Sequence, residues 1–204
     1  MAKLYFHYST MNAGKSTLLL QAAHNYGEMG MATYLVTAQF DNRAGMGRIA
    51  SRIGIGDPAD TFGPGEDMFA KIKTRLEAEP VACVFIDEAQ FLSQRQVWQL
   101  AQVVDDLKVP VMCYGLRVDF QGRLFPGSAA LLAWADEMRE VRTICHCGKK
   151  ATMVVRRGPD GTALTQGAQV QIGGNETYIS LCRKHWREAL GDPGGEAGIF
   201  GENS

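Results

Sequence analysis

The sequence predicts an α/β fold, a parallel sheet flanked by helices, with a small β-rich segment added near the C-terminus. Three observations predict it. An apolar run at residues 4–8 leads through a tight loop into an Ala/Leu-rich run. Further apolar runs at 32–38, 81–86 and 109–114 alternate with stretches of helical spacing. From Cys145 onward the composition changes to cysteine, histidine and short strand-like segments.

Size and composition suit one domain, or one domain with a small appendage. The chain has 204 residues, of which 46% are hydrophobic, enough for a substantial core. The net charge is −1, so no global field draws the chain to nucleic acid or to a membrane, and any anion site must be local. We expect no membrane span and no signal peptide. Five cysteines, two of them inside apolar runs, favour a reduced cytoplasmic protein over a disulfide scaffold.

The loop after the first predicted strand resembles a phosphate-binding P-loop. Gly14, Lys15 and Ser16 match the second half of that signature, whereas Ser9 stands where glycine is usual. Backbone N–H groups of residues 12–16 can cradle phosphate oxygens at a helix N-terminus. Lys15 would bridge the outer phosphates and the Ser16 hydroxyl would ligate Mg²⁺. The alternative is a capped helix start with a chance Gly-Lys-Ser. The ATP-binding residues expected here are Ser9, Thr10, Met11, Asn12, Ala13, Gly14, Lys15 and Ser16.

The helix after this loop is predicted over about residues 14–28, with Gly30 as its C-terminal stop. A buried strand follows at 32–38. The segment 41–56 then interleaves three arginines with glycines. It is either a solvated loop or a mobile loop that brings guanidinium groups over phosphate, with Arg52 as the preferred candidate.

The remaining elements of this half continue the alternation. Residues 66–79 have helical spacing that a proline ends, and 97–107 has a further helical pattern. A strand is predicted at 109–114, and because proline lacks a backbone N–H, Pro110 suggests the first residue of that strand. A helix over 128–137 and a last strand at 141–144 complete the α/β half.

The carboxylates after the strand at 81–86 predict the second half of a nucleotide site. Ligands of open α/β sheets gather at the carboxyl ends of strands, so Asp87 would hold the Mg²⁺ shell opposite Ser16. Successive strand residues point to opposite sides, and a carboxylate beside the metal can accept a proton, so Glu88 is the leading general base. The alternatives are a helix cap for Asp87 and a surface carboxylate at a helix start for Glu88. The expected ATP-binding residues of this stretch are Asp87, Glu88, Ala89 and Gln90.

The loop at 115–127 also follows the carboxyl end of a predicted strand. It mixes glycines with Leu116, Phe120 and Phe125. Such a loop can wall a pocket for a flat heterocycle, and core packing is the alternative.

Two pairs of metal ligands bracket the β-rich segment. Cys145 and Cys147 form the first pair, and Cys182 and His185 the second. Together they can supply four tetrahedral ligands, and four protein ligands predict a closed, structural Zn²⁺ site. The first pair is tighter than the usual C-x-x-C, and His146 could compete as a ligand. Free thiols or redox chemistry are the alternatives.

Between the pairs the pattern is strand, Gly-Pro-Asp-Gly turn, strand. The Ile-Gly-Gly-Asn run at 172–175 offers backbone amides that can read a base edge without side chains. We therefore predict a P-loop α/β domain at 1–143, a zinc-binding domain at 144–190 and a disordered tail at 191–204.

Together these motifs resemble the bacterial branch of the class II (cytosolic-type) thymidine kinases. Besides the P-loop and the zinc pairs, the chain shows Asp-Glu-x-Gln-Phe at 87–91, Tyr-Gly-Leu-Arg-x-Asp-Phe at 114–120 and Ile-Gly-Gly-x-x-x-Tyr at 172–178. The resemblance covers about residues 3–190, and bacterial members share the non-glycine start of the P-loop and the short C-x-C. The implied fold is a P-loop (RecA-like) parallel sheet flanked by helices, with a small β-rich zinc-binding lasso domain.

The resemblance implies transfer of the γ-phosphoryl of ATP, with Mg²⁺, to the 5′-hydroxyl of deoxythymidine, with Glu88 as the base. It implies that the lasso backbone reads the thymine, that Tyr178 packs nearby, and that Arg52 and Arg157 lie near the phosphates. It also implies a cytoplasmic homotetramer inhibited by dTTP. The implied substrate-binding residues are Met11, Arg52, Leu116, Phe120, Phe125, Arg157, Val170, Ile172, Gly173, Gly174 and Tyr178.

Two other classes of function remain open. A P-loop ATPase would direct the Asp-Glu pair at water and turn ATP over without a nucleoside, although the short chain and the absent basic stripe argue against it. A zinc-ribbon module for nucleic acid or protein would keep a degenerate nucleotide site and show a basic face. Residues that give such a face some support are Lys149, Lys150, Arg156, Arg157, Arg183 and Lys184.

Overall fold

The computed structural model describes residues 1–39, 47–169 and 177–191, and the chain divides into two compact units. Unit 1 comprises Met1–Tyr8, Gly14–Leu116 and Phe125–Val141. Unit 2 comprises Ser9–Ala13, Arg117–Leu124 and the chain from Arg142 onward. Unit 2 therefore joins two short segments of the N-terminal half to the chain from Arg142 onward. No helix among the described residues is long and apolar enough to cross a membrane.

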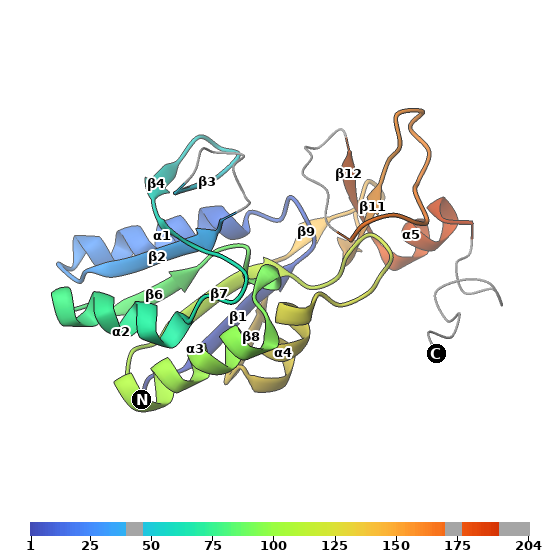
Figure 1. The fold of residues 1–204 in the computed structure, drawn as a ribbon. Helices are drawn as coiled ribbons and strands as arrows, with labels where there is room; N and C mark the ends of the chain where they lie inside the picture. The colour runs from blue at the N-terminus through green and yellow to red at the C-terminus, as the bar shows by residue number, and fades with distance from the viewer. Residues whose placement is uncertain (40–46, 170–176, 192–204) are drawn as a thin grey trace. The chain divides into compact units, whose positions relative to one another are not determined.

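Unit 1 is built on a six-stranded sheet in the order β5-β2-β6-β7-β1-β8 (Figure 1). The strands are β1 (Leu4–Ser9), β2 (Thr33–Ala38), β5 (Asp60–Phe62), β6 (Cys83–Ile86), β7 (Val111–Leu116) and β8 (Glu137–Glu140). The pairings β5–β2, β2–β6, β6–β7 and β1–β8 are parallel. Because helices bury both faces of such a sheet, its central strands are nearly continuous apolar runs, and the sequence located them for that reason.

Helices cover both faces of this sheet. Helix α1 (Lys15–Glu28) lies on one face, and α2 (Met68–Ala78), α3 (Gln94–Leu107) and α4 (Pro126–Trp134) lie on the other (Figure 1). The core divides in the same way. Phe85 of β6 packs in the cluster that contains Leu19 of α1, whereas its neighbour Ile86 packs in the larger cluster with Leu100 of α3. The two-residue alternation of a strand thus supplies both layers.

Side-chain caps start two of the helices of unit 1, α2 and α3. The Ser93 hydroxyl accepts from the Gln96 N–H, and the Gln96 side-chain oxygen accepts from the Ser93 N–H, so a capping box starts α3 three residues before the predicted position 97. Asp67 accepts from the Ala70 N–H at the start of α2. Gly30, at φ 71°, follows the end of α1, as predicted.

The arginine-rich segment contains more regular structure than a loop. Strands β3 (Arg48–Ala50) and β4 (Gly56–Pro58) pair as an antiparallel hairpin, and Arg52 lies in its turn. A short 3₁₀ helix, η1 (Ala89–Phe91), follows β6. Residues 40–46 of the arginine-rich segment lie outside the described residues.

Two predicted element assignments in the α/β half are wrong. The last strand of the sheet is β8 at Glu137–Glu140, which pairs with β1, rather than a strand at 141–144. The helix predicted to reach residue 137 ends at Trp134. Strand β8 reads Glu-Met-Arg-Glu and forms an edge, so it shows no apolar alternation, and only its pairing with β1 identifies it.

Within its described residues, unit 2 contains two antiparallel ribbons and one short helix. Strands β9 (Thr143–Ile144) and β10 (Lys150–Ala151) form one ribbon, and β11 (Met153–Arg156) and β12 (Tyr178–Leu181) form the other. Helix α5 (Arg183–Ala189) follows.

Trp186 of α5 packs in the hydrophobic core of unit 2 and donates hydrogen bonds to two other segments of that unit. Its side chain is 5% exposed, and its ring N–H lies 3.1 Å from both Phe120 O and Val154 O, to which it donates. Gly122, at φ 80°, approaches so closely that an added Cβ would lie 3.1 Å from the indole.

Candidate active site and metal centre

Ser16 and Asp87 lie in contact at the carboxyl end of the unit 1 sheet. Ser16, in the first turn of α1, donates from its hydroxyl to Asp87 Oδ2 at 2.8 Å. Asp87 follows β6, its backbone N–H donates to Val36 O, and the residue is only 5% exposed. A hydroxyl and a carboxylate are oxygen ligands that suit Mg²⁺. The donor set therefore fits the ion that the sequence assigns to these two residues.

The electrostatics of Asp87 also favour a cation. Burial, and then the neighbouring Glu88 carboxylate, raise the pKa of Asp87 above its ordinary range. Hydrogen bonds from the Ser16 hydroxyl and the Glu88 N–H, and the Lys15 ammonium, oppose that rise. A bound divalent cation would reverse the balance because it favours the ionised carboxylate.

Glu88 has an unusual backbone. It adopts the left-handed conformation, at φ 52° and ψ 37°, which few non-glycine residues occupy. The chain therefore changes direction directly after Asp87. The Glu88 side chain accepts a hydrogen bond at 2.5 Å from the amide nitrogen of Gln90, which is 1% exposed. Such a strained, tethered carboxylate is a mark of functional sites.

The predicted P-loop is shared by the two units. Gly14, at φ 81°, is the N-cap of α1 and belongs to unit 1. Ser9–Ala13 belongs to unit 2, where Thr10 Oγ1 lies 2.6 Å from Ser180 Oγ. The Ser180 hydroxyl donates to Met11 O at 2.6 Å. Strand β12 therefore holds the first half of the loop within unit 2.

Three predicted substrate residues from distant parts of the sequence lie in one apolar cluster of unit 2. Phe120 and Tyr178 are 1% and 7% exposed, and Met11 packs against them. The other members of the cluster are Val154 and Leu164. The cluster combines flat rings with a flexible thioether, which suits contact with a planar heterocycle.

Sequence reasoning missed the contribution of Arg156 to this cluster. Arg156 is 3% exposed, its guanidinium carbon lies 3.9 Å from the centre of the Phe120 ring, and its Nη1 donates to Ala168 O at 2.8 Å. Alternation along β11 was the available signal, because it places Arg156 on the same face as the buried Val154. A buried guanidinium over the ring holds Phe120 in a fixed position.

Asp119 is a second residue that sequence reasoning missed. It is 3% exposed and accepts from the N–H groups of Gln121 and Arg123, both at 2.9 Å. It also accepts a hydrogen bond from the Gln169 side-chain amide at 2.9 Å. Gln169 is the last residue of the described range 47–169. The Asp-x-x-Gly spacing to Gly122 was a turn signal that could have found it.

The other predicted substrate residues have varied surroundings. Leu116 and Phe125 belong to unit 1, where Phe125 packs edge-on against Phe91 with ring centres 5.8 Å apart. Arg52 and Arg157 are exposed. The predicted lasso residues Val170, Ile172, Gly173 and Gly174 lie outside the described residues.

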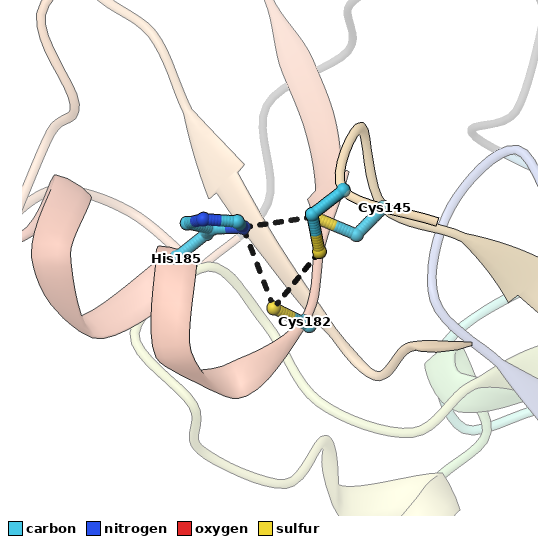
Figure 2. Close-up of side chains that lie close together, drawn as sticks. Cys145, Cys182 and His185 are labelled. Carbon is cyan, nitrogen blue, oxygen red and sulfur yellow. Dashed lines mark hydrogen bonds between the residues drawn. The ribbon is translucent and has the colours of Figure 1, made fainter. Parts of the chain in front are cut away.

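The four predicted zinc ligands form a compact cluster, and Figure 2 shows three of them, Cys145, Cys182 and His185. All four ligand atoms of Cys145, Cys147, Cys182 and His185 lie within 4.8 Å of one another. His185 Nδ1 is 3.3 Å from Cys145 Sγ and 3.5 Å from Cys182 Sγ, and Cys147 Sγ is 3.9 Å from Cys182 Sγ. Sulfur ligands at 2.3 Å from a tetrahedral zinc are roughly 3.8 Å apart, so the cluster has the size and donor set of a Zn²⁺ site.

The local environment prepares this cluster for a cation. Desolvation raises the pKa of Cys145, but backbone N–H groups of Cys147 and Cys182 and the His185 side chain together lower it to about 6. A thiolate is the form that binds zinc. His146 stacks on His185 with ring centres 4.2 Å apart and is not part of the cluster.

Comparison with known proteins places the chain in a family. Residues 2–186 match the thymidine kinase family model. The thymidine kinase of Ruegeria pomeroyi (strain ATCC 700808 / DSM 15171 / DSS-3) is 77% identical over 194 residues, 95% of this chain and 98% of that protein. The thymidine kinase of Jannaschia sp. (strain CCS1) is 73% identical over 94% of this chain and 98% of that protein. That of Haemophilus influenzae (strain 86-028NP) is 56% identical over 94% and 99%, respectively. This chain belongs to the thymidine kinase family.

Proposed function

We propose that this protein transfers the γ-phosphoryl group of ATP to the 5′-hydroxyl of deoxythymidine, giving dTMP and ADP in nucleotide salvage. One observation carries the proposal. In a chain of this family, the P-loop serine hydroxyl contacts the buried Asp87, and Glu88 directly follows Asp87. A metal-side carboxylate next to a candidate base is the arrangement that phosphoryl transfer to a hydroxyl requires.

At the nucleotide, the chain contributes charge and backbone donors. The N–H groups at the start of α1 hold phosphate oxygens, and Lys15 bridges the outer phosphates. Ser16 and Asp87 hold Mg²⁺, which when bound neutralises the charge that develops on the transferring group. The proposed ATP-binding residues are Ser9, Thr10, Met11, Asn12, Ala13, Gly14, Lys15, Ser16, Asp87, Glu88, Ala89 and Gln90.

Glu88 acts on the acceptor. Its carboxylate accepts the proton of the 5′-hydroxyl while that oxygen forms its bond to the γ-phosphorus and the bond to the bridging oxygen of ADP breaks. Little covalent chemistry falls to the protein, so positioning and electrostatics account for most of the rate.

The nucleoside is recognised mainly by residues of unit 2. Met11, Phe120 and Tyr178 pack on the pyrimidine ring, supported by the Arg156 guanidinium behind Phe120. Backbone groups of Val170, Ile172, Gly173 and Gly174 read the base edge. The Cys₃His cluster would hold Zn²⁺, which would link residues 145–147 to residues 182–185 on either side of this segment. The remaining proposed substrate contacts are Leu116, Phe125, Arg52 and Arg157.

Assembly, regulation and location follow from the family resemblance. We include in the proposal a homotetramer, inhibition by dTTP and a cytoplasmic location.

The test is ADP release from ATP and Mg²⁺ with a panel of nucleosides. We expect release that depends strongly on deoxythymidine and little on cytidine or adenosine. ADP release without any nucleoside would instead indicate an ATPase that uses water. No turnover with any nucleoside, together with binding of nucleic acid or protein, would indicate a zinc-ribbon module.

A further inference from the structure

The side chain of Gln90 has both of its polar ends engaged inside unit 1. Gln90 is 1% exposed. Its Nε2 donates to Glu88 Oε2 at 2.5 Å, and its Oε1 accepts from the Leu116 N–H at 2.9 Å. A carboxamide carries a donor and an acceptor on one rigid plane, so it can join a carboxylate to a backbone N–H. A bridge therefore runs from Glu88 to the last residue of β7.

Close backbone packing on two sides fixes the segment that carries Gln90. A Cβ added to Gly115 would lie 2.9 Å from Gln90 N and from Gln90 Oε1. A Cβ added to Gly127 would lie 2.6 Å from Ala89 O and from Leu92 O. Neither neighbouring chain has room for a side chain, so η1 is held between β7 and α4 with little freedom to shift.

The far end of the bridge is also anchored. The hydroxyl of Ser128, which is fully buried, donates to Leu116 O at 2.5 Å. Gln90 therefore holds the N–H of Leu116 and Ser128 holds its carbonyl. The C-terminal residue of β7 is therefore held by the side chains of Gln90 and Ser128.

We propose that Gln90 is a positioning residue for the catalytic base, a role that rests on the proposed function of Glu88. The Glu88 carboxylate stands on a left-handed turn, and the hydrogen bond from Gln90 selects one of its rotamers. A base must lie within hydrogen-bond reach of the proton that it accepts. Both polar ends of the Gln90 side chain have partners within the protein, so the side chain acts on the reaction through Glu88.

Gln90→Glu tests the bridge with little change of shape. Measured at alkaline pH, where the new carboxyl is ionised, the variant keeps an oxygen to accept from the Leu116 N–H but has no donor to Glu88. We expect kcat for thymidine phosphorylation to fall about 10- to 100-fold, because a misplacement of about 1 Å can cost up to roughly 10²-fold. Unchanged kcat in this variant would overturn the proposal.

Ser128→Ala is the matched control, because it removes the other hydrogen bond to Leu116 and leaves Glu88 tethered. We expect it to retain kcat. An equal loss of kcat in Ser128→Ala would assign the effect to the strand end and overturn a role through Glu88.

A double-mutant cycle separates positioning from a structural role and adds no charge. Gln90→Met should lower kcat in the wild-type background and have no further effect in Glu88→Gln, because the group that Gln90 positions is then no longer a base. A loss of the same factor in both backgrounds would overturn the proposal. A wild-type protein without thymidine-dependent ADP release would instead overturn the proposed function itself, whereas an active wild type with an active Gln90→Glu variant would overturn only the role of Gln90.

Discussion

The two units of this molecule hold their functional residues by different means. In unit 1, Ser16 and Asp87 sit at the ends of elements whose apolar side chains fill large clusters on both faces of a six-stranded sheet. In unit 2, Phe120 and Tyr178 belong to a small cluster that includes Val154 of the β11–β12 ribbon, and a compact Cys₃His group lies in the same unit. The candidate Mg²⁺ ligands of unit 1 are thus held by a large hydrophobic core, whereas the residues of unit 2 are held by a small cluster and by individual contacts.

This difference predicts different responses to perturbation. A large sheet with helices on both faces buries enough apolar area to fold without a metal, whereas a small β-rich unit usually needs a disulfide or a metal to be stable. Substitutions at the nucleotide site of unit 1 should therefore lower the rate of the chemical step and leave the fold of that unit intact. Losses at the zinc end should be conformational and should reduce nucleoside binding more than ATP binding.

The largest expected effect is on the chemical step in unit 1. Glu88→Gln keeps the size of the side chain and removes its ability to accept a proton. We expect ATP affinity to remain and kcat to fall about 10²- to 10⁴-fold, the usual contribution of a general base. Steady-state ADP release together with equilibrium ATP binding checks this. Turnover close to wild type would remove Glu88 from the role.

The next effect separates the two units. Cys182→Ala, or zinc removal with a chelator, takes away one ligand or the ion itself, so unit 2 should loosen. We expect affinity for thymidine to fall more strongly than affinity for ATP, as measured by calorimetry with each ligand and by zinc content. His146→Ala is the matched control, because His146 lies beside the cluster without belonging to it, and it should keep its zinc. Survival of both zinc content and thymidine affinity in Cys182→Ala would contradict the assignment.

The smallest effect is a pH dependence of stability that arises in unit 1. His7 stacks on Tyr114 with ring centres 4.4 Å apart, and its Nε2 is buried without a hydrogen-bond partner. Burial, and then the charge of Arg139, lower the pKa of His7 to about 4. The pKa of His7 is about 6.5 in the unfolded chain and about 4 in the native chain, so between these pH values the unfolded chain binds a proton that the native chain does not. The native state therefore loses stability as pH falls through this range.

His7→Phe isolates this contribution, because phenylalanine can stack on Tyr114 and does not titrate. With zinc saturating, we expect the thermal midpoint of wild type to fall more steeply from pH 6.5 to 4 than that of the variant. Identical slopes in the two proteins would show that the zinc ligands and other groups account for the whole acid response.

Local patterns in the sequence predicted most of the fold. The apolar runs located β2, β6 and β7, and Gly30 marked the end of α1. Strand β8 escaped prediction because its polar residues carry no alternation, and the start of α3 was placed late because apolar spacing does not reveal a capping box. Both errors concern features that depend on hydrogen bonds rather than on hydrophobicity.

For the candidate site, the division between sequence and tertiary structure is equally clear. By itself the sequence determined the chemical inventory: a P-loop lysine and serine, a strand-end Asp-Glu pair, and four zinc ligands with suitable spacing. Each of these is encoded by a few neighbouring residues. Only the tertiary structure placed the Gln90 amide between Glu88 and Leu116, the Arg156 guanidinium on Phe120 and the Gln169 amide on Asp119. Apart from the short link from Gln90 to Glu88, each of these contacts joins residues more than 20 positions apart in the sequence. A local sequence pattern does not specify such contacts, because only the packing of the folded chain brings the residues together.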